Sequence, residues 1–144
     1  MRKAFLFIGL FTTAVLLAAC HRQPNYQPPP LTGTDVSISL SSLQHENPQF
    51  YTYTVNGTNV NFFIVRLNER IQSFLDACVT CYPKKRGYAD RNGYVECRAC
   101  DMSFSLYKLE KGIGGCYPIK IEGRIENGNY RIPISTLVKA ADRF

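Results

Sequence analysis

The sequence predicts an α+β fold, a small β-rich single domain of antiparallel hairpins with one or two short helices around a cysteine-rich metal site. Three observations support this prediction. Asn-Gly pairs that begin at Asn56, Asn92 and Asn127 each join two β-rich runs, which is the strongest short-range sign of a hairpin. Two C-x2-C pairs with fifteen residues between them flank one of these turns. Residues 35–144, about 110 in number, have the length of one domain.

The first half of this domain has the pattern of strands. Residues 35–43 alternate apolar and polar side chains, as a half-buried strand does. Residues 49–67 contain two β-rich runs around Asn56-Gly57 and therefore predict a hairpin. Residues 70–78 predict a third strand, which delivers Cys78 from its end.

The second half mixes strands with short helices. Residues 101–112 predict a short helix that ends at Gly112. Residues 119–135 predict another hairpin, with its turn near Asn127-Gly128. Ser135 is placed to cap a last helix over residues 136–143.

The first twenty residues have the pattern of a bacterial export signal. Arg2 and Lys3 precede an apolar run of sixteen residues, 4–19, which is short of the roughly 20 that span a bilayer. The run ends in "LAAC", which resembles the lipobox of lipoprotein precursors and predicts that Cys20 is lipidated. An ordinary secretory signal with an incidental cysteine is the alternative.

This pattern divides the chain into three parts: a signal peptide (1–19), a lipidated Pro-rich tether (20–34) and a cysteine-rich metal-binding domain (35–144). We therefore expect an exported protein, lipid-anchored to the cell-envelope membrane and facing the periplasm or the exterior. Palmitate and the other acyl chains of such an anchor make it stable, because one chain binds only reversibly.

The charge of the chain argues against nucleic acid as a partner. Without Arg2 and Lys3, fifteen basic residues face eleven acidic ones, a net charge of +4 that is spread along the sequence.

The sequence also lacks the G-x-S-x-G, phosphate-loop and H-E-x-x-H motifs, so a hydrolase is not expected.

The cysteine count points to a metal. Lipidation of Cys20 leaves five cysteines, an odd number that cannot all form disulfides within one chain. Four of them match the C-x2-C-x15–20-C-x2-C pattern of four-thiolate sites, in which two tight turns face each other across one ion. The Asn92-Gly93 turn returns the chain and brings the second pair to the first. These four are Cys78, Cys81, Cys97 and Cys100.

Spacing alone leaves several occupants open. A c-type haem is excluded, because Tyr82 and Asp101 stand where its attachment motif needs histidine. The compact cysteine run of bacterial ferredoxins is absent. Structural zinc, mononuclear iron, an iron–sulfur cluster with dispersed ligands, and two disulfides all remain.

A fifth cysteine completes a resemblance to a known family. Cys116 lies in a Gly-Gly-Cys-Tyr-Pro turn, after two C-x2-C pairs that flank Gly87-Tyr88. In this arrangement residues 56–144 resemble the FtrD-like family of membrane iron–sulfur proteins, found with bacterial iron-permease systems. Tyr117 stands where that family more usually has asparagine, and the large transmembrane portion of some members is missing.

The resemblance implies a site and a partner. It implies iron, as an iron–sulfur cluster or a mononuclear centre, with zinc as the alternative cofactor. It also implies a membrane iron permease or transporter and a redox partner. The implied ligands are the two C-x2-C pairs with Cys116 as an alternative or additional ligand: Cys78, Cys81, Cys97, Cys100 and Cys116.

Three functions follow from these observations. The first is a lipoprotein for electron transfer or metal handling, a non-enzymatic electron carrier or metal-binding protein. The second is a binding module whose zinc is structural, with its function on another surface. The third is a thiol–disulfide protein, although the βαβ context of a thioredoxin-like motif is absent.

Other residues near the cysteines have plainer interpretations. His45 is expected at the surface, and Met102 is expected to pack in the core. The run from Lys84 to Arg86 either stabilises thiolates or forms a solvated loop. Four tyrosines crowd the cysteines in sequence and are candidates for shielding the site from water: Tyr82, Tyr88, Tyr94 and Tyr117.

Overall fold

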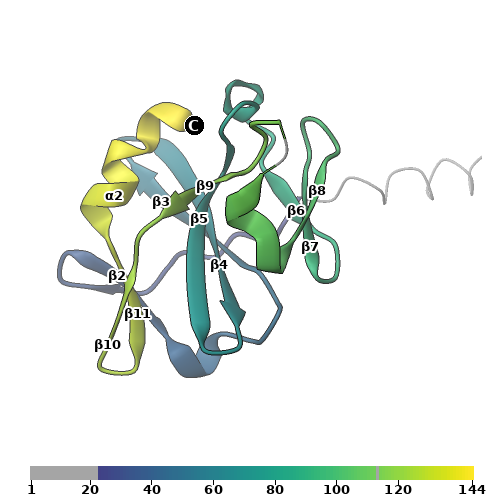
Figure 1. Ribbon diagram of the computed structural model, residues 1–144. Helices are drawn as coiled ribbons and strands as arrows, with labels where there is room; N and C mark the ends of the chain where they lie inside the picture. The colour runs from purple at the N-terminus through teal and green to yellow at the C-terminus, as the bar shows by residue number, and fades with distance from the viewer. Residues whose placement is uncertain (1–22, 113) are drawn as a thin grey trace, which may run out of the picture.

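The computed structural model describes residues 23–112 and 114–144 (Figure 1). Its central antiparallel sheet has the strand order β3-β4-β5-β9. The Asn56-Gly57 turn joins the first two strands, and both residues have the positive φ that such a turn requires, 47° and 82°. The strands are β3 (Gln49–Val55), β4 (Thr58–Leu67), β5 (Arg70–Cys78) and β9 (Pro118–Ile121).

A second antiparallel sheet lies beside the first and has the order β1-β2-β11-β10 (Figure 1). The predicted hairpin near Asn127-Gly128 forms its β10–β11 pair, in which Ile125 lies opposite Tyr130. The predicted strand that begins at Asp35 is the partner of β11. The strands are β1 (Leu31–Thr32), β2 (Asp35–Ser39), β10 (Arg124–Glu126) and β11 (Asn129–Pro133).

A third, smaller sheet holds the segment between the cysteine pairs. Its order is β6-β7-β8, and the Asn92-Gly93 turn joins β6 to β7 as predicted. In this pair Tyr88 lies opposite Cys97. The strands are β6 (Tyr88–Asp90), β7 (Tyr94–Cys97) and β8 (Ser103–Ser105).

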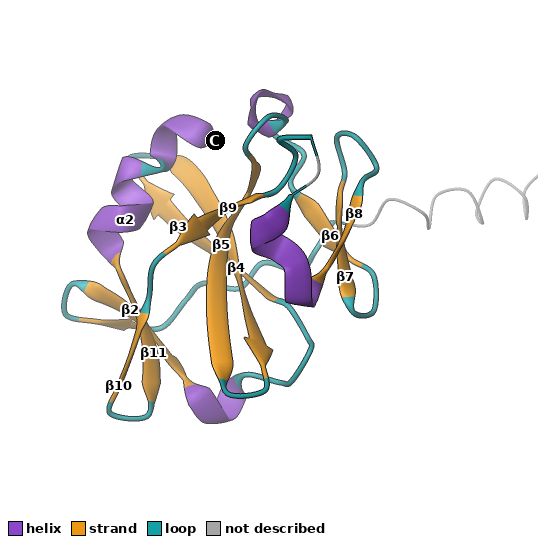
Figure 2. Ribbon diagram, in the orientation of Figure 1, coloured by secondary structure: helices purple, strands orange, loops and turns teal. Residues whose placement is uncertain are grey.

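Helices are few and short, as Figure 2 shows. The single α-helix described is α2 (Ile134–Lys139), and a 3-10 turn η5 (Ala141–Arg143) follows it. The other 3-10 segments are η2 (Leu40–Ser42), η3 (Tyr82–Lys84) and η4 (Leu106–Lys111). No helix in the described ranges has the length and apolar character needed to cross a membrane.

Two details of the predicted helices were wrong. The segment 101–112 divides into β8 and η4, because Ser105 accepts the backbone N–H of Tyr107 and starts a separate 3-10 segment, which is kinked at Lys108. The last helix begins one residue before Ser135, with Pro133 in the cap position and no side-chain cap. The α+β, β-rich fold itself is confirmed.

The central sheet is buried on both faces, and this divides the interior into two cores. Alternation along a strand points successive side chains to opposite faces. On β4, Phe62 and Ile64 belong to the first core, whereas Phe63 and Val65 belong to the second, and all four are fully buried. The first core joins the two larger sheets and α2, while the second lies between the central sheet and the small sheet.

Part of the expected tether is attached to this domain. Gln27 donates its backbone N–H to Phe50 O (3.1 Å) and accepts that of Thr52 (3.0 Å), which makes a short parallel bridge beside β3. Tyr26 packs edge-on against Phe50 and donates its hydroxyl to Asp76. The folded unit therefore includes residues before Asp35.

Candidate metal centre

Three loops at one end of the central and small sheets carry five cysteines. Cys78 ends β5 and Cys81 begins the turn that leads into η3. Cys97 ends β7, and Cys100 lies in the turn that follows. Cys116 precedes β9, and the backbone bond from Val79 N to Tyr117 O (3.0 Å) holds its loop against the first turn.

Each C-x2-C pair turns in the same way around its first sulfur. The backbone N–H groups of Thr80 and Cys81 point at the Cys78 sulfur, and those of Ala99 and Cys100 point at the Cys97 sulfur. Such N–H donors stabilise a thiolate, because they favour the charged form of the sulfur. Both turns therefore prepare their first cysteine to act as an anionic ligand.

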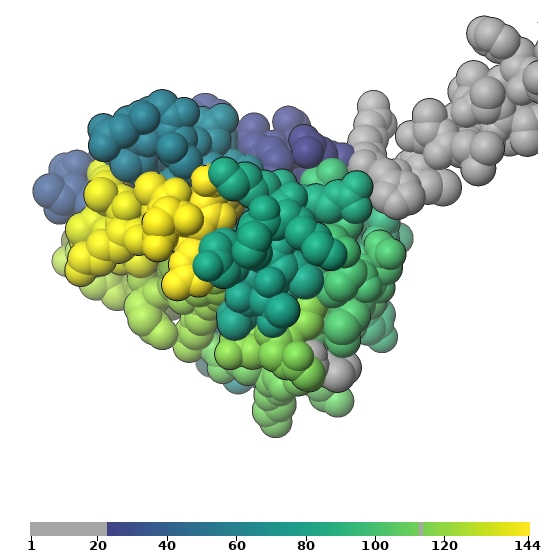
Figure 3. Space-filling view, turned by 90° about the horizontal axis from the view of Figure 1, so that it is seen from above, coloured from purple at the N-terminus to yellow at the C-terminus, as the bar shows by residue number. Residues whose placement is uncertain are grey.

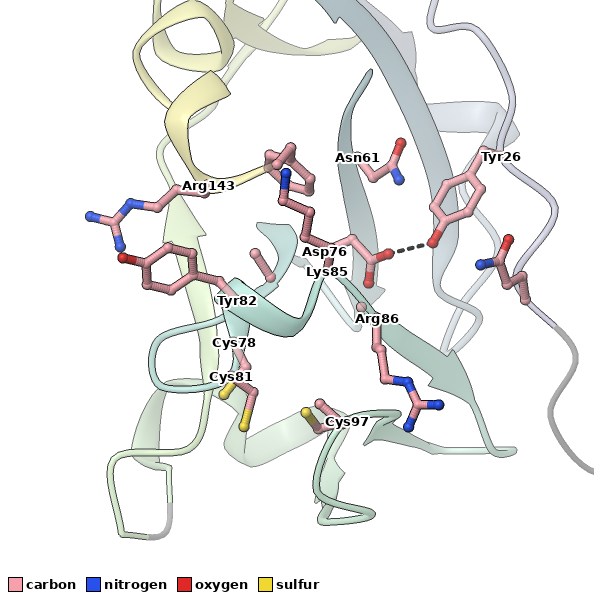
Figure 4. Close-up of a pocket in the computed structure, with 15 residues that line it drawn as sticks. Tyr26, Asn61, Asp76, Cys78, Cys81, Tyr82, Lys85, Arg86, Cys97 and Arg143 are labelled. Carbon is pink, nitrogen blue, oxygen red and sulfur yellow. Dashed lines mark hydrogen bonds between the residues drawn. The ribbon is translucent and has the colours of Figure 1, made fainter. Parts of the chain in front are cut away.

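The sulfurs converge on one point. The Sγ atoms of Cys78, Cys81, Cys97 and Cys116 all lie within 4.8 Å of one another. Figure 4 shows three of them, with the Cys97 sulfur facing the pair from the first turn. The Sγ of Cys116 is also 3.2 Å from that of Cys78 and 3.2 Å from that of Cys100. All five cysteines are free thiols.

This arrangement fits a metal ion. Four sulfurs at about 2.3 Å from a tetrahedral ion lie about 3.8 Å from each other, which is inside the 4.8 Å that encloses the four sulfurs here. Cys78, Cys97 and Cys116 are buried, and the other two sulfurs are partly exposed. The site therefore combines soft ligands, close spacing and partial shielding from water.

The thiols cannot all ionise together without a cation. Burial raises the pKa of Cys97 to about 12, and burial and the neighbouring thiols also raise that of Cys116. Burial opposes ionisation of Cys78 too, but hydrogen bonds from Cys116 and the backbone N–H groups of its turn outweigh it and bring its pKa to about 7. A bound cation removes this conflict by compensating the negative charge of the sulfurs.

Comparison with known protein families matches residues 33–144 to the family described as membrane iron-sulfur containing protein FtrD-like. The chain belongs to the FtrD-like family. No curated protein and no solved structure matches the chain. Family membership confirms the resemblance read from the cysteine pattern, and together with the sulfur cluster it indicates a metal or iron–sulfur site in this FtrD-like domain.

Two arginines join the cysteine turns of the FtrD-like domain. Arg86, after the first turn, donates to Arg98 O (3.3 Å), and Arg98 donates back to Arg86 O (2.7 Å). The backbone N–H of Arg98 also bonds Gly87 O (2.9 Å). These three hydrogen bonds fix the two C-x2-C turns to each other.

A cavity of about 70 Å³ reaches the cysteines from the side of the central sheet. Cys78, Cys81 and Cys97 line one side of it, and Asp76 and Tyr26 line another (Figure 4). Asp76 is buried and accepts the Tyr26 hydroxyl and the backbone N–H of Tyr88 (2.7 Å). Burial, opposed by these bonds, raises the pKa of its carboxyl to about 6.

The chain end closes this region. Arg143 lies over the Tyr82 ring, 4.7 Å from its centroid. In the view from above, the yellow C-terminal segment lies against the teal loop after β5 (Figure 3). Arg143 and Phe144 also line the cavity, so the C-terminus forms part of the wall beside the first cysteine turn.

The remaining sequence-predicted residues take different places. His45 lies at the surface, away from the sulfur group, and pairs with Asn68. Met102 packs against the second core, as expected. Tyr88 is fully buried in that core, but Tyr94 is 51% exposed and shields nothing. Cys20 lies outside the described residues.

Sequence reasoning missed three residues around the sulfurs: Tyr26, Asp76 and Arg98. A charged residue inside the apolar run "FLDAC", two positions before a cysteine, is a signal that could have drawn attention to Asp76. Tyr26 reaches the cavity only through the fold, and no local pattern marks the role of Arg98, although it lies next to Cys97.

Proposed function

We propose that this FtrD-like protein is a membrane-anchored lipoprotein that binds iron or an iron–sulfur centre and serves a membrane iron transport system by passing electrons or metal. The observation that carries the proposal is the convergence of four sulfurs within 4.8 Å, in a domain whose family is described as iron–sulfur. Bound iron supplies one-electron transfer, and the chain's own residues hold it and exclude water.

The ligand set of the proposal is Cys78, Cys81, Cys97 and Cys116. Cys100 lies 3.2 Å from Cys116 and is partly exposed, so it is placed to exchange with that ligand or to add to the set. An exposed fifth thiol suits metal handover, because an incoming or departing ion needs a temporary ligand at the surface.

A membrane partner fits the surface around the site. Lys84, Lys85 and Arg86 are exposed beside the first cysteine turn. These three positive side chains are suited to steer a redox or transport protein with a negatively charged surface toward the sulfurs. With lipidation at Cys20, the domain and a membrane iron permease occupy the same surface, which raises the chance of encounter.

Metal content tests the proposal directly. The full-length protein, extracted in detergent and purified without air, is analysed for metals and for visible absorption. Iron with thiolate or sulfide absorption that bleaches on reduction is the expected result. Zinc alone, or metal-free protein with two disulfides and one thiol, contradicts it. Metabolic labelling with palmitate, compared between wild type and Cys20→Ser, tests the anchor.

The sulfur spacing favours one alternative, a structural zinc. Sulfurs that share one ion lie close together, whereas those bound to different irons of a cluster lie farther apart. Here all four sulfurs lie within 4.8 Å of one another, which suits a single ion better than a cluster of several irons. A colourless, redox-silent protein with one zinc per chain selects this alternative over mononuclear iron.

A further inference from the structure

The second core contains a buried hydroxyl that lacks a conventional partner. Tyr88 is 0% exposed, and among the described residues its hydroxyl oxygen makes no hydrogen bond of ordinary geometry. Buried polar groups are nearly always paired, so an unpaired one calls for an explanation. The surroundings of this oxygen supply it.

The Tyr88 hydroxyl faces the sulfur cluster. Burial raises the pKa of this hydroxyl, and the neighbouring Cys78, Cys97 and Cys116 thiols raise it further. Cys97 lies directly opposite Tyr88 in the β6–β7 pair. The hydroxyl is therefore buried in the same core as three of the four sulfurs that share one point.

The ring cannot turn to another partner. Its edge-on contacts with Phe63 and Phe104 place the ring centroids 6.0 and 6.3 Å apart. The backbone N–H of Tyr88 is fixed by Asp76, and the preceding residue, Gly87, lies so close to the same carboxylate that a Cβ there meets it at 2.3 Å. The backbone and the ring are both held, so the hydroxyl keeps its direction.

We propose that Tyr88 is a positioning residue of the metal centre, whose hydroxyl donates a hydrogen bond to the Cys78 sulfur once that sulfur is a metal-bound thiolate. This deepens the proposed function and rests on it. A thiolate accepts such a bond better than a thiol does, because its sulfur carries negative charge. The bond strengthens further when the centre gains an electron, so it raises the reduction potential.

The test compares Tyr88→Phe with wild type in the full-length protein. The substitution removes one oxygen and keeps the ring. Tyr94→Phe is the matched control, since it removes the same atom from the neighbouring strand at an exposed site. Iron-loaded samples are titrated anaerobically with dithionite, whose S–S bond breaks to give two SO2 radical anions; each passes one electron to a centre and is oxidised to sulfite. We expect a lower potential for Tyr88→Phe and no change for the control.

Cobalt substitution gives a second measurement that does not depend on the native metal. Loss of the hydrogen bond makes the Cys78 sulfur a better electron donor, so the thiolate-to-Co²⁺ charge-transfer band of Tyr88→Phe is expected at longer wavelength than that of wild type. If wild type and Tyr88→Phe have the same reduction potential when loaded with iron and the same charge-transfer band when loaded with Co²⁺, the role of Tyr88 is overturned and the proposed function stands. A wild type that shows no thiolate band with Co²⁺ overturns both.

Discussion

Replacing Cys97 by alanine should destabilise one core of the protein and leave the other in place. Cys97 is 1% exposed and belongs to the four-sulfur group, so its loss removes a ligand. A structural thiolate-bound metal contributes on the order of 10 kcal/mol to folding, which is comparable to the whole stability of a domain, about 5–15 kcal/mol.

The structure indicates where this loss should fall. The small sheet has strands of three, four and three residues, and strands this short need support from outside. The second core, which supports them, includes Cys78, Cys97 and Cys116. The first core contains no cysteine among its described residues. Metal loss should therefore open the small sheet and spare the two larger ones.

Hydrogen exchange of backbone amides measures this difference. In Cys97→Ala, the free energy of opening measured for the β7 amides should fall by on the order of 10 kcal/mol. If the wild-type value is smaller than this, the amides should lose their protection entirely. β2 and β11 should remain protected where β7 is not, because no ligand lies in the first core and it can stay folded when the small sheet opens. Tyr94→Phe, at an exposed position of the same strand, is the control and should keep both the metal and the protection. An equal loss in both cores refutes this reasoning, as does unchanged protection in β7.

Three further results are expected. Gly87→Ala should lower the free energy of unfolding by more than about 1 kcal/mol, because the φ of Gly87 is +65° and a Cβ there meets the Asp76 carboxylate. Gly93→Ala is the control: its φ is also positive, but a Cβ there has open space, so its loss in the same urea titration should be smaller. Tyr26→Phe should lose about 1.5–3 kcal/mol and expose residues 23–27 to protease, and an unchanged digestion rate contradicts the contact with Asp76. Metal affinity should rise about tenfold per pH unit for each proton released, because Cys97 with a pKa of about 12 stays protonated near neutrality until metal binds; a chelator competition that is flat between pH 7 and 8 opposes this.

Local signals explain why the hairpins were predictable. Asn56, Asn92 and Asn127 all adopt positive φ, a conformation that asparagine followed by glycine favours in any context. The two turns of the candidate metal site were predictable for a similar reason, since each C-x2-C pair forms its turn from four consecutive residues. Neither the hairpins nor these turns need information from distant parts of the chain.

The remaining features depend on distant contacts. The run Phe62–Val65 is apolar without alternation, so its pattern could not reveal that its two faces serve two different cores. The segment 101–112 has the composition of a helix, but pairing of β8 with β7 overrides it. Cys116 meets Cys78 because β9 pairs with the end of β5. The partners of Asp76, Tyr26 and Tyr88, are 50 and 12 positions away from it along the chain.

The attached N-terminal segment, residues 23–27, also limits how far the sulfurs can move relative to the start of the folded unit. Gln23 lines the same cavity as Cys81 and Cys97, and Tyr26 fixes the following residues to Asp76. A pull on the chain before residue 23 therefore reaches the domain at its cysteine end, through the contact between Tyr26 and Asp76, and not through either of the two larger sheets.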